Sequence, residues 1–175
     1  MARTTLEARS QPGGIQTFLP GSDTTGAVFF VDSVTGTDAA GRGQNSDTPL
    51  ATIDYAIGLC TASKGDRIYA MPGHAETIAG AGGIACDVAG VSIIGLGEGR
   101  NRPTITFSAV ASTLAISAAN VTLRDLILTC TAATTKMVDI TAANVTLDRI
   151  DYFEGSGIPL QFVLTTNAAD QLTVK

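Results

Sequence analysis

Two segments of this chain have nearly the same sequence and lie 24 residues apart. The first is ISAANVTLRDL at residues 116–126, and the second is ITAANVTLDRI at residues 140–150. Weaker copies lie upstream at Ala89–Ile93 and downstream at Ala168–Val174. A period of 20 to 30 residues in strand-rich sequence is typical of a solenoid, in which each repeat forms one coil and buries its apolar face only against its neighbours. The repeat therefore predicts a coil-on-coil β stack rather than a sandwich.

Stacking the two copies predicts which residues lie over one another. Asn tolerates the left-handed backbone region, so Asn120 and Asn144 are expected at a sharp corner, where their amides can form a ladder. The charged residues of the two copies occur in swapped order, so opposite charges face each other between coils and set the register. The predicted pairs are Asn120 with Asn144, Val121 with Val145, Leu123 with Leu147, Arg124 with Asp148, and Asp125 with Arg149.

Short apolar runs separated by turn residues predict the other strands. These are Val28–Val31, Arg67–Met71, Val88–Ile94, Thr104–Phe107, Leu114–Ser117 and Val121–Leu128. No long helical pattern separates them, so β-α-β crossovers are not expected.

One helix is predicted, at about residues 52–63. Ile53, Ala56, Ile57 and Cys60 follow the i, i+3, i+4, i+7 spacing of one helix face. Thr52 is the expected N-cap and Asp54 lies in the first turn, while Lys64 and Gly65 provide the expected C-terminal stop.

Residues 1–27 predict an extended arm that precedes a β domain at 28–175. The arm contains Pro12-Gly13-Gly14 and Pro20-Gly21, and it has too little apolar surface to fold alone. We expect Ile15, Phe18 and Leu19 to anchor it on another surface.

The charge balance excludes several partners. Net charge is −5, only 15% of residues are charged, and no run of Lys or Arg occurs, so no nucleic-acid partner is expected. No apolar stretch approaches the ~20 residues of a membrane span, so no membrane partner is expected. The first residues have no apolar core of the kind that a secretory signal needs, so we expect the protein to be assembled in a host cytoplasm.

In two features, the AANVTL repeat and the segment 29–76, the chain resembles right-handed parallel β-helix proteins of the pectate-lyase-like superfamily, particularly small phage-encoded members. That segment reads FFVDSVTGTDAAGRGQNSDTPLATIDYAI followed by KGDRIYAMPGHAE, like the entry block of such helices. The resemblance implies an all-β right-handed parallel β-helix of about four to five coils, with an N-terminal capping helix over the bore. The carboxyl end has no recognisable cap, so either a partner covers it or the last segment folds over it.

Many members of that superfamily cleave acidic polysaccharides, using calcium held by several Asp or a close set of Asp as acid and base. Neither set is recognisable here. Asp125, Asp148 and Asp151 each have a nearby Arg, which favours a structural role. They remain the residues to test for an enzyme.

Other candidate groups also have a simpler structural interpretation. His74 and Glu76 form a possible acid–base pair, and the loop with Asp32, Asp38 and Asp47 is a possible cation site. Residues 95–99, GLGEG, lack the following helix of a phosphate loop and are expected to form a solenoid corner. The three cysteines, Cys60, Cys86 and Cys130, lack metal spacing and are expected to be buried. No metal or cofactor is expected.

These features predict a non-enzymatic structural protein of a tailed-phage virion. A capsid-decoration (cement) protein that binds the major capsid protein, as a homotrimer, is the first expectation. The alternatives are a tail-associated, tailspike-like protein that cleaves glycans, and a receptor-binding module without catalysis.

Overall fold

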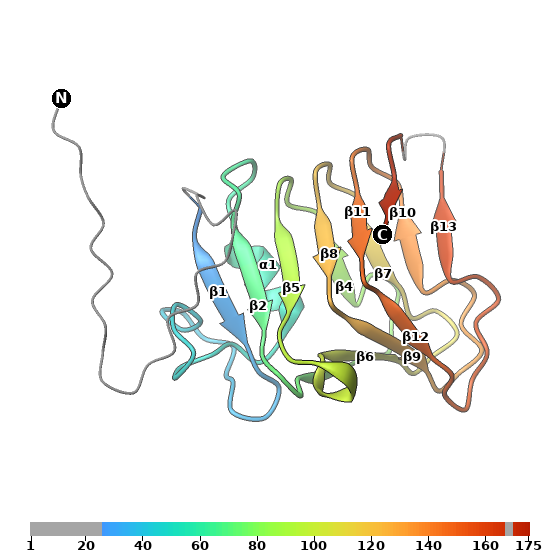
Figure 1. Ribbon diagram of the computed structural model, residues 1–175, viewed down its shortest axis with the longest axis horizontal. Coiled ribbons are helices and arrows are strands. Elements are labelled where there is room, and N and C mark those ends of the chain that lie inside the picture. Colours follow the sequence, from blue (N-terminus) through green and yellow to red (C-terminus); the bar gives the residue numbers. More distant parts are fainter. Residues whose placement is uncertain (1–25, 167–169) are drawn as a thin grey trace, which may run out of the picture.

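The computed structural model describes residues 26–166 and 170–175, which form a parallel β-solenoid of about four turns (Figure 1). This confirms the all-β coil-on-coil prediction. The arm predicted at 1–27, with Ile15, Phe18 and Leu19, lies outside the described residues except for Gly26 and Ala27.

Three parallel sheets form the walls of the solenoid. Sheet A has the order β1 (Val28–Val31), β2 (Arg67–Ala70), β5 (Ser92–Gly95), β8 (Thr122–Arg124), β11 (Thr146–Asp148) and β14 (Thr173–Val174). Sheet B has the order β3 (Ala75–Ile78), β6 (Thr104–Phe107), β9 (Ile127–Cys130) and β12 (Asp151–Phe153). Sheet C has the order β4 (Ile84–Cys86), β7 (Leu114–Ile116), β10 (Val138–Ile140) and β13 (Val163–Thr165).

Apolar side chains stack in register along the bore. Phe29, Ile68, Ile93, Leu123 and Leu147 occupy one column of paired positions on successive strands of sheet A, and all are buried. The predicted pairing of Leu123 with Leu147 and of Arg124 with Asp148 is therefore confirmed. Because side chains alternate along a strand, the residues on either side of this column face outward.

A column of left-handed residues forms the corner that leads into sheet A. Gly65, Gly90, Asn120, Asn144 and Gln171 all have positive φ, between 57° and 78°. The first four lie three residues before a member of the apolar column, and Gln171 lies three residues before Val174, which pairs with Leu147, so the corners are in register. The corner predicted for the two Asn residues is confirmed. A backbone hydrogen bond joins the two coils there, from the Asn120 N–H to the Ala143 carbonyl oxygen.

Corners interrupt two segments that look continuous in the sequence: a second corner, at Asp125, interrupts one, and the first corner, at Gly90, interrupts the other. The run predicted as one strand, Val121–Leu128, is two strands, β8 and β9, because Asp125 adopts a left-handed φ of 58° between them. Likewise, the strand predicted at Val88–Ile94 is wrong in its first half, since Gly90 turns the chain (φ 78°) before β5 begins.

The helix is shorter than predicted. α1 spans Ile53–Leu59 and ends at Cys60, whose backbone is extended, so Lys64 and Gly65 do not terminate it. The N-terminal prediction is confirmed, because the Thr52 hydroxyl accepts a hydrogen bond from the Tyr55 amide (3.3 Å). The helix packs against β1, β2 and β4, near the N-terminal end of the bore (Figure 1).

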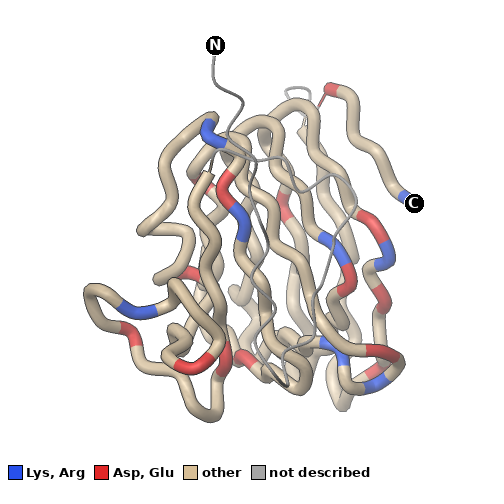
Figure 2. The backbone as a smooth tube through the Cα atoms, turned by 60° about the vertical axis from the view of Figure 1, so that its left-hand side comes forward, with Lys and Arg blue, Asp and Glu red and all other residues tan. Residues whose placement is uncertain are grey.

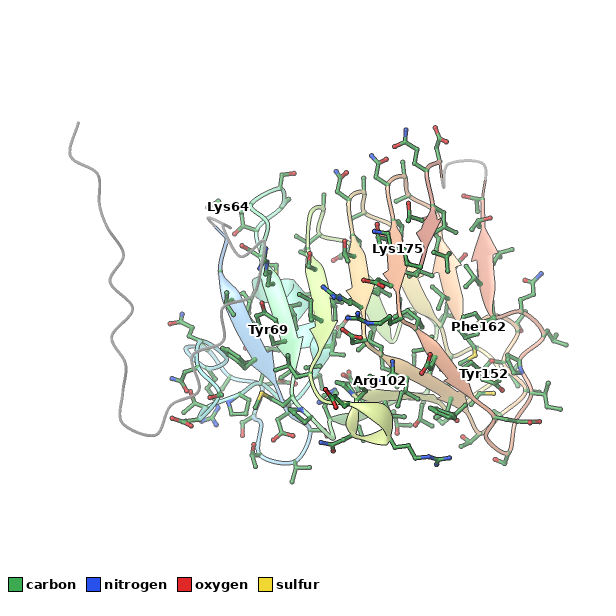
Figure 3. All side chains as sticks on the ribbon, in the orientation of Figure 1. Lys64, Tyr69, Arg102, Tyr152, Phe162 and Lys175 are labelled. Atoms are coloured by element: carbon green, nitrogen blue, oxygen red, sulfur yellow. The ribbon has the colours of Figure 1, made fainter. Side chains whose placement is uncertain are left out.

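The two ends of the described solenoid differ in how they are covered. At the N-terminal end the loop before α1 pairs with β1, because the Leu50 amide donates to Phe30 and the Asp32 amide donates to Leu50. At the other end, the residues of β12 and β14 are exposed. Tyr152 packs edge-on against Phe162 there, with ring centroids 5.8 Å apart (Figure 3).

The prediction that all three cysteines are buried is wrong for one of them. Cys86 and Cys130 are buried, but Cys60 is only partly buried, because it lies just past the end of the shortened helix. Burial raises the pKa of both the Cys60 and the Cys86 thiols to about 12, which leaves them weakly reactive.

Candidate functional site

Six charged side chains form a connected group beside the second corner, where sheet A turns into sheet B. We call this group the Arg–Asp ladder; it consists of Arg102, Arg124, Asp125, Asp148, Arg149 and Asp151. Figure 2 shows that Lys, Arg, Asp and Glu residues also lie at other places along the tube. Four of the six, Arg124, Asp125, Asp148 and Arg149, come from the second parts of the two sequence repeats, which is why stacking the repeats brings them together.

Asp125 and Arg149 make the best-defined contact of the ladder. The Arg149 Nε and Nη2 atoms donate to the two carboxylate oxygens of Asp125, at 2.5 and 2.6 Å. The hydrogen bond from Arg149 holds the pKa of Asp125 below its usual value, although partial burial acts in the opposite direction. The predicted facing of these two charges between coils is therefore present as a bidentate pair.

Arg124 also connects the two repeats. Its Nε atom lies 3.3 Å from a carboxylate oxygen of Asp148 and 3.4 Å from one of Asp125. The guanidinium therefore lies between a carboxylate of its own coil and one of the next coil. This arrangement separates the two acids with a positive charge.

Arg102 is the member that the sequence did not predict. It comes from the turn before β6, donates to the carbonyl oxygens of Gly99 and Arg149, each at 3.2 Å, and forms an ion pair with Asp151. Its side chain is 12% exposed. Arg102 and Asp151 are 49 positions apart and belong to no repeat, so no signal in the sequence relates them.

A hollow of about 380 Å³ lies next to the ladder on the outward face of sheet A. Its lining includes the apolar or aromatic side chains of Tyr69, Ile94 and Leu96 and the charged side chains of Arg67, Arg124, Asp125 and Arg149. A second hollow, of about 410 Å³, lies around the turn at 97–99 and shares Asp125 and Arg149. Asp125 and Arg149 thus border both hollows.

The geometry limits what these acids can do chemically. Sugar hydrolysis needs one carboxyl that holds a proton near neutral pH and a second that is free to act as base or nucleophile. Asp125 has a lowered pKa and both of its oxygens accept from Arg149. Asp148 and Asp151 each form an ion pair with an arginine. The arrangement is that of a structural charge network.

The His74–Glu76 pair lies inside the protein. His74 is fully buried, and its Nε2 atom lies 3.2 Å from Glu76 Oε2, which also accepts from the Ile53 amide at 3.0 Å. Glu76 thereby joins sheet B to the first residue of α1. The pair is inaccessible to a substrate, which agrees with the structural interpretation.

In the acidic loop, the carboxylates of Asp32 and Asp38 accept hydrogen bonds from nearby backbone N–H and hydroxyl groups. Asp38 accepts from the amides of Ala51 and Thr52 and from the Thr52 hydroxyl, and Asp32 accepts from Val34 and Thr35. The GLGEG segment forms a turn in which Gly97 has a φ of 99°. Within residues 26–166 and 170–175, no group of three or more His, Cys, Asp or Glu side chains is arranged to hold a metal ion.

Comparison with known proteins identifies no relative. The chain has no significant match to any protein-family model, curated protein or solved structure. In the part of the chain that the structure describes, no helix has the length and apolarity needed to cross a bilayer.

Proposed function

We propose that this protein is a non-enzymatic structural protein whose solenoid serves as a rigid body for assembly. The observation that carries the proposal is the pairing of Asp125, Asp148 and Asp151 with arginines of the Arg–Asp ladder. Carboxylates held in this way fix the register between coils, and they are poorly suited to proton transfer.

The site of assembly that we propose is the virion of a tailed phage, with capsid decoration as the specific role. The support is the resemblance of residues 29–76 and of the two AANVTL coils to small phage-encoded β-helix proteins of the pectate-lyase-like superfamily. The partner is the major capsid protein, and the protein binds it as a homotrimer at three-fold sites of the shell. In this proposal residues 1–27 contact the shell, and the apolar side chains of Ile15, Phe18 and Leu19 contribute affinity that offsets the cost of ordering the segment there.

Cosedimentation of the purified protein with phage heads that lack it tests this role. Saturable binding at a fixed ratio to the major capsid protein, with three copies at each three-fold site, is the expected result. Deleting residues 2–25 is expected to weaken binding. Absence of binding to heads would contradict capsid decoration.

A tail-associated protein that binds or cleaves host glycans is the second candidate. The observation in its favour is the hollow beside Tyr69, where an aromatic ring lies near the carboxylate of Asp125. The test is cleavage of host surface glycans by the wild-type protein and by the variant D125N/D148N/D151N. Cleavage that is lost in the folded triple variant would establish the enzyme and overturn the structural proposal.

A further inference from the structure

The outward face of sheet A carries several apolar side chains in its N-terminal half, beside the polar side chains of Arg67 and Ser92. Val28 and Phe30 on β1, Tyr69 on β2, and Ile94 and Leu96 in and just after β5 gather there. We call these five residues the sheet A patch. Four of them are half-buried, as the outward residues of β8 and β11 are, and Tyr69 is buried.

The same face becomes polar in the later coils. The outward residues of β8 and β11 are Thr122, Arg124, Thr146 and Asp148. The stack of coils alone therefore does not require an apolar outer face. The sheet A patch is a local feature of the first three strands.

Tyr69 has the most unusual position in the patch. It alternates with the bore residues Ile68 and Ala70 and so points outward, yet it is only 7% exposed. Tyr69 is labelled in Figure 3. Phe30 stacks against its ring, with ring centroids 5.8 Å apart, and Tyr69 also lines the hollow of about 380 Å³. The lining of this hollow offers Tyr69, Ile94 and Leu96 to an apolar occupant.

We propose that residues 15–19 of the same chain, with Ile15, Phe18 and Leu19, bind in this hollow. The first argument is chemical. The sequence from residue 10 to residue 22, SQPGGIQTFLPGS, contains no charged side chain. Arg124 and Arg149, which line the hollow, form ion pairs with Asp125, so a neutral apolar segment suits this part of the hollow better than a charged ligand. Arg67 also lines the hollow.

The second argument is reach. The described chain begins at Gly26, just before β1, which is the edge strand next to the patch. Phe18 precedes Gly26 by eight residues, which span at most about 26 to 29 Å. From β1 to β8, at the far side of the hollow, is three strand spacings, or about 14 Å. The hollow also extends along the strands to Asp125, which lies five register positions beyond the level of Gly26 and adds about 17 Å. The direct distance to this far corner is then about 22 Å, so Phe18 reaches it when the intervening chain is nearly extended.

This inference is independent of the proposed role in a virion. In the free protein the sheet A patch holds residues 15–19, and binding to another surface then exchanges this contact for a new one. Since the test uses the purified protein without heads, its outcome does not depend on capsid binding.

Thiol cross-linking tests the contact directly. Ser92, on β5, lines the hollow. The double variant Thr17→Cys/Ser92→Cys is treated with a short bis-maleimide. The matched control combines Thr17→Cys with Thr129→Cys, an outward and equally half-buried position on β9 of sheet B. The unmodified protein reports the background from Cys60, Cys86 and Cys130.

The expected result is a cross-link within one chain that forms about tenfold faster with Cys at position 92 than with Cys at position 129, because a bound segment has a high effective concentration at its site. Equal rates would overturn the proposal. A product of twice the chain mass would also overturn it, because the segment would then bind to a second copy.

A second variant separates loss of the contact from loss of the fold. Leu96→Glu, in the Thr17→Cys/Ser92→Cys background, places a charge in the hollow and is expected to slow cross-linking about tenfold. Thr129→Glu in the same background is expected to leave the rate unchanged. An unchanged circular dichroism spectrum shows that both variants are folded. A cross-linking rate that Leu96→Glu leaves unaffected would contradict the binding of residues 15–19 in the hollow.

Discussion

Arg149 holds Asp125 of the preceding coil with two hydrogen bonds, of 2.5 and 2.6 Å, from Nε and Nη2. Both residues adopt a left-handed backbone, with φ of 52° and 58°. The pair therefore joins two successive corners of the solenoid at the point where sheet A turns into sheet B. A slip of one residue would separate the two side chains, so the pair specifies the register between coils.

The stability that Asp125 contributes is expected to depend on pH. Its pKa is lowered in the folded protein, chiefly by the hydrogen bond from Arg149, so its ionised form stabilises the fold above the usual pKa of 3.8. That contribution is lost as pH falls through the lowered pKa. Asp125→Asn should therefore reduce the free energy of unfolding at pH 7, with the difference from wild type vanishing in strong acid.

Urea denaturation of both proteins from pH 7 down to about pH 2 measures this effect. Asp47→Asn, in an exposed stretch of the acidic loop, serves as the control and is expected to show no such dependence. A difference between Asp125→Asn and wild type that grows as pH falls would contradict the assigned role.

Leu123 fills the bore between Ile93 and Leu147 and is 1% exposed. Leu123→Ala is expected to lower the free energy of unfolding by about 2 to 5 kcal/mol, because a cavity remains between two coils. Thr122→Ala, the outward neighbour on the same strand, should cost less than about 0.5 kcal/mol. Chemical denaturation distinguishes the two, and equal losses would argue against the assigned bore.

Gln171 occupies a corner position that Gly90 occupies three coils earlier, and both have positive φ. A side chain in the left-handed region costs about 1 to 2 kcal/mol, so Gln171→Gly is expected to raise the free energy of unfolding by up to about 1 kcal/mol. Gly90→Ala should lower it, because φ is unsuitable and the added Cβ would lie 3.3 Å from Ser63 Cα. Thermal denaturation of both variants measures the effects, which should have opposite signs.

Glu76 connects the helix to sheet B by accepting from the Ile53 amide while lying against His74. Glu76→Ala is expected to lower the free energy of unfolding by about 1 to 3 kcal/mol, since a buried donor loses its partner. Glu76→Gln retains an acceptor oxygen and should cost less. Hydrogen exchange of the α1 amides reports whether the loss is local, and similar protection in the wild type and Glu76→Ala would refute the link.

Parts of this architecture were predictable because the signals repeat or lie close together in the chain. The two AANVTL copies share an offset of 24 residues, so their register and the facing of Arg124 and Asp148 followed from superposing them. The Thr52 N-cap followed from a local pattern at the start of α1. Such features depend on neighbouring residues or on an explicit repeat.

The corners at Asp125 and Arg149 were not predictable in the same way. Neither residue is a glycine, and the apolar run around Asp125 looks like one continuous strand. The left-handed conformation at Asp125 is stabilised by the following coil, since the Asp125 backbone N–H donates to the Asp148 carbonyl oxygen and Arg149 binds the Asp125 carboxylate. A local pattern cannot show a turn that depends on the neighbouring coil.

The sequence by itself determined the solenoid class, the bore residues and the pairing of the two repeats, because stacking identical segments satisfies all of them at once. Only the tertiary structure decided where each coil turns, that Arg102 reaches Asp151 across 49 positions, and that His74 and Glu76 lie beneath the first residue of α1. The physical reason is that these contacts join different coils or different walls. Their partners come together only after the chain has wound around the bore.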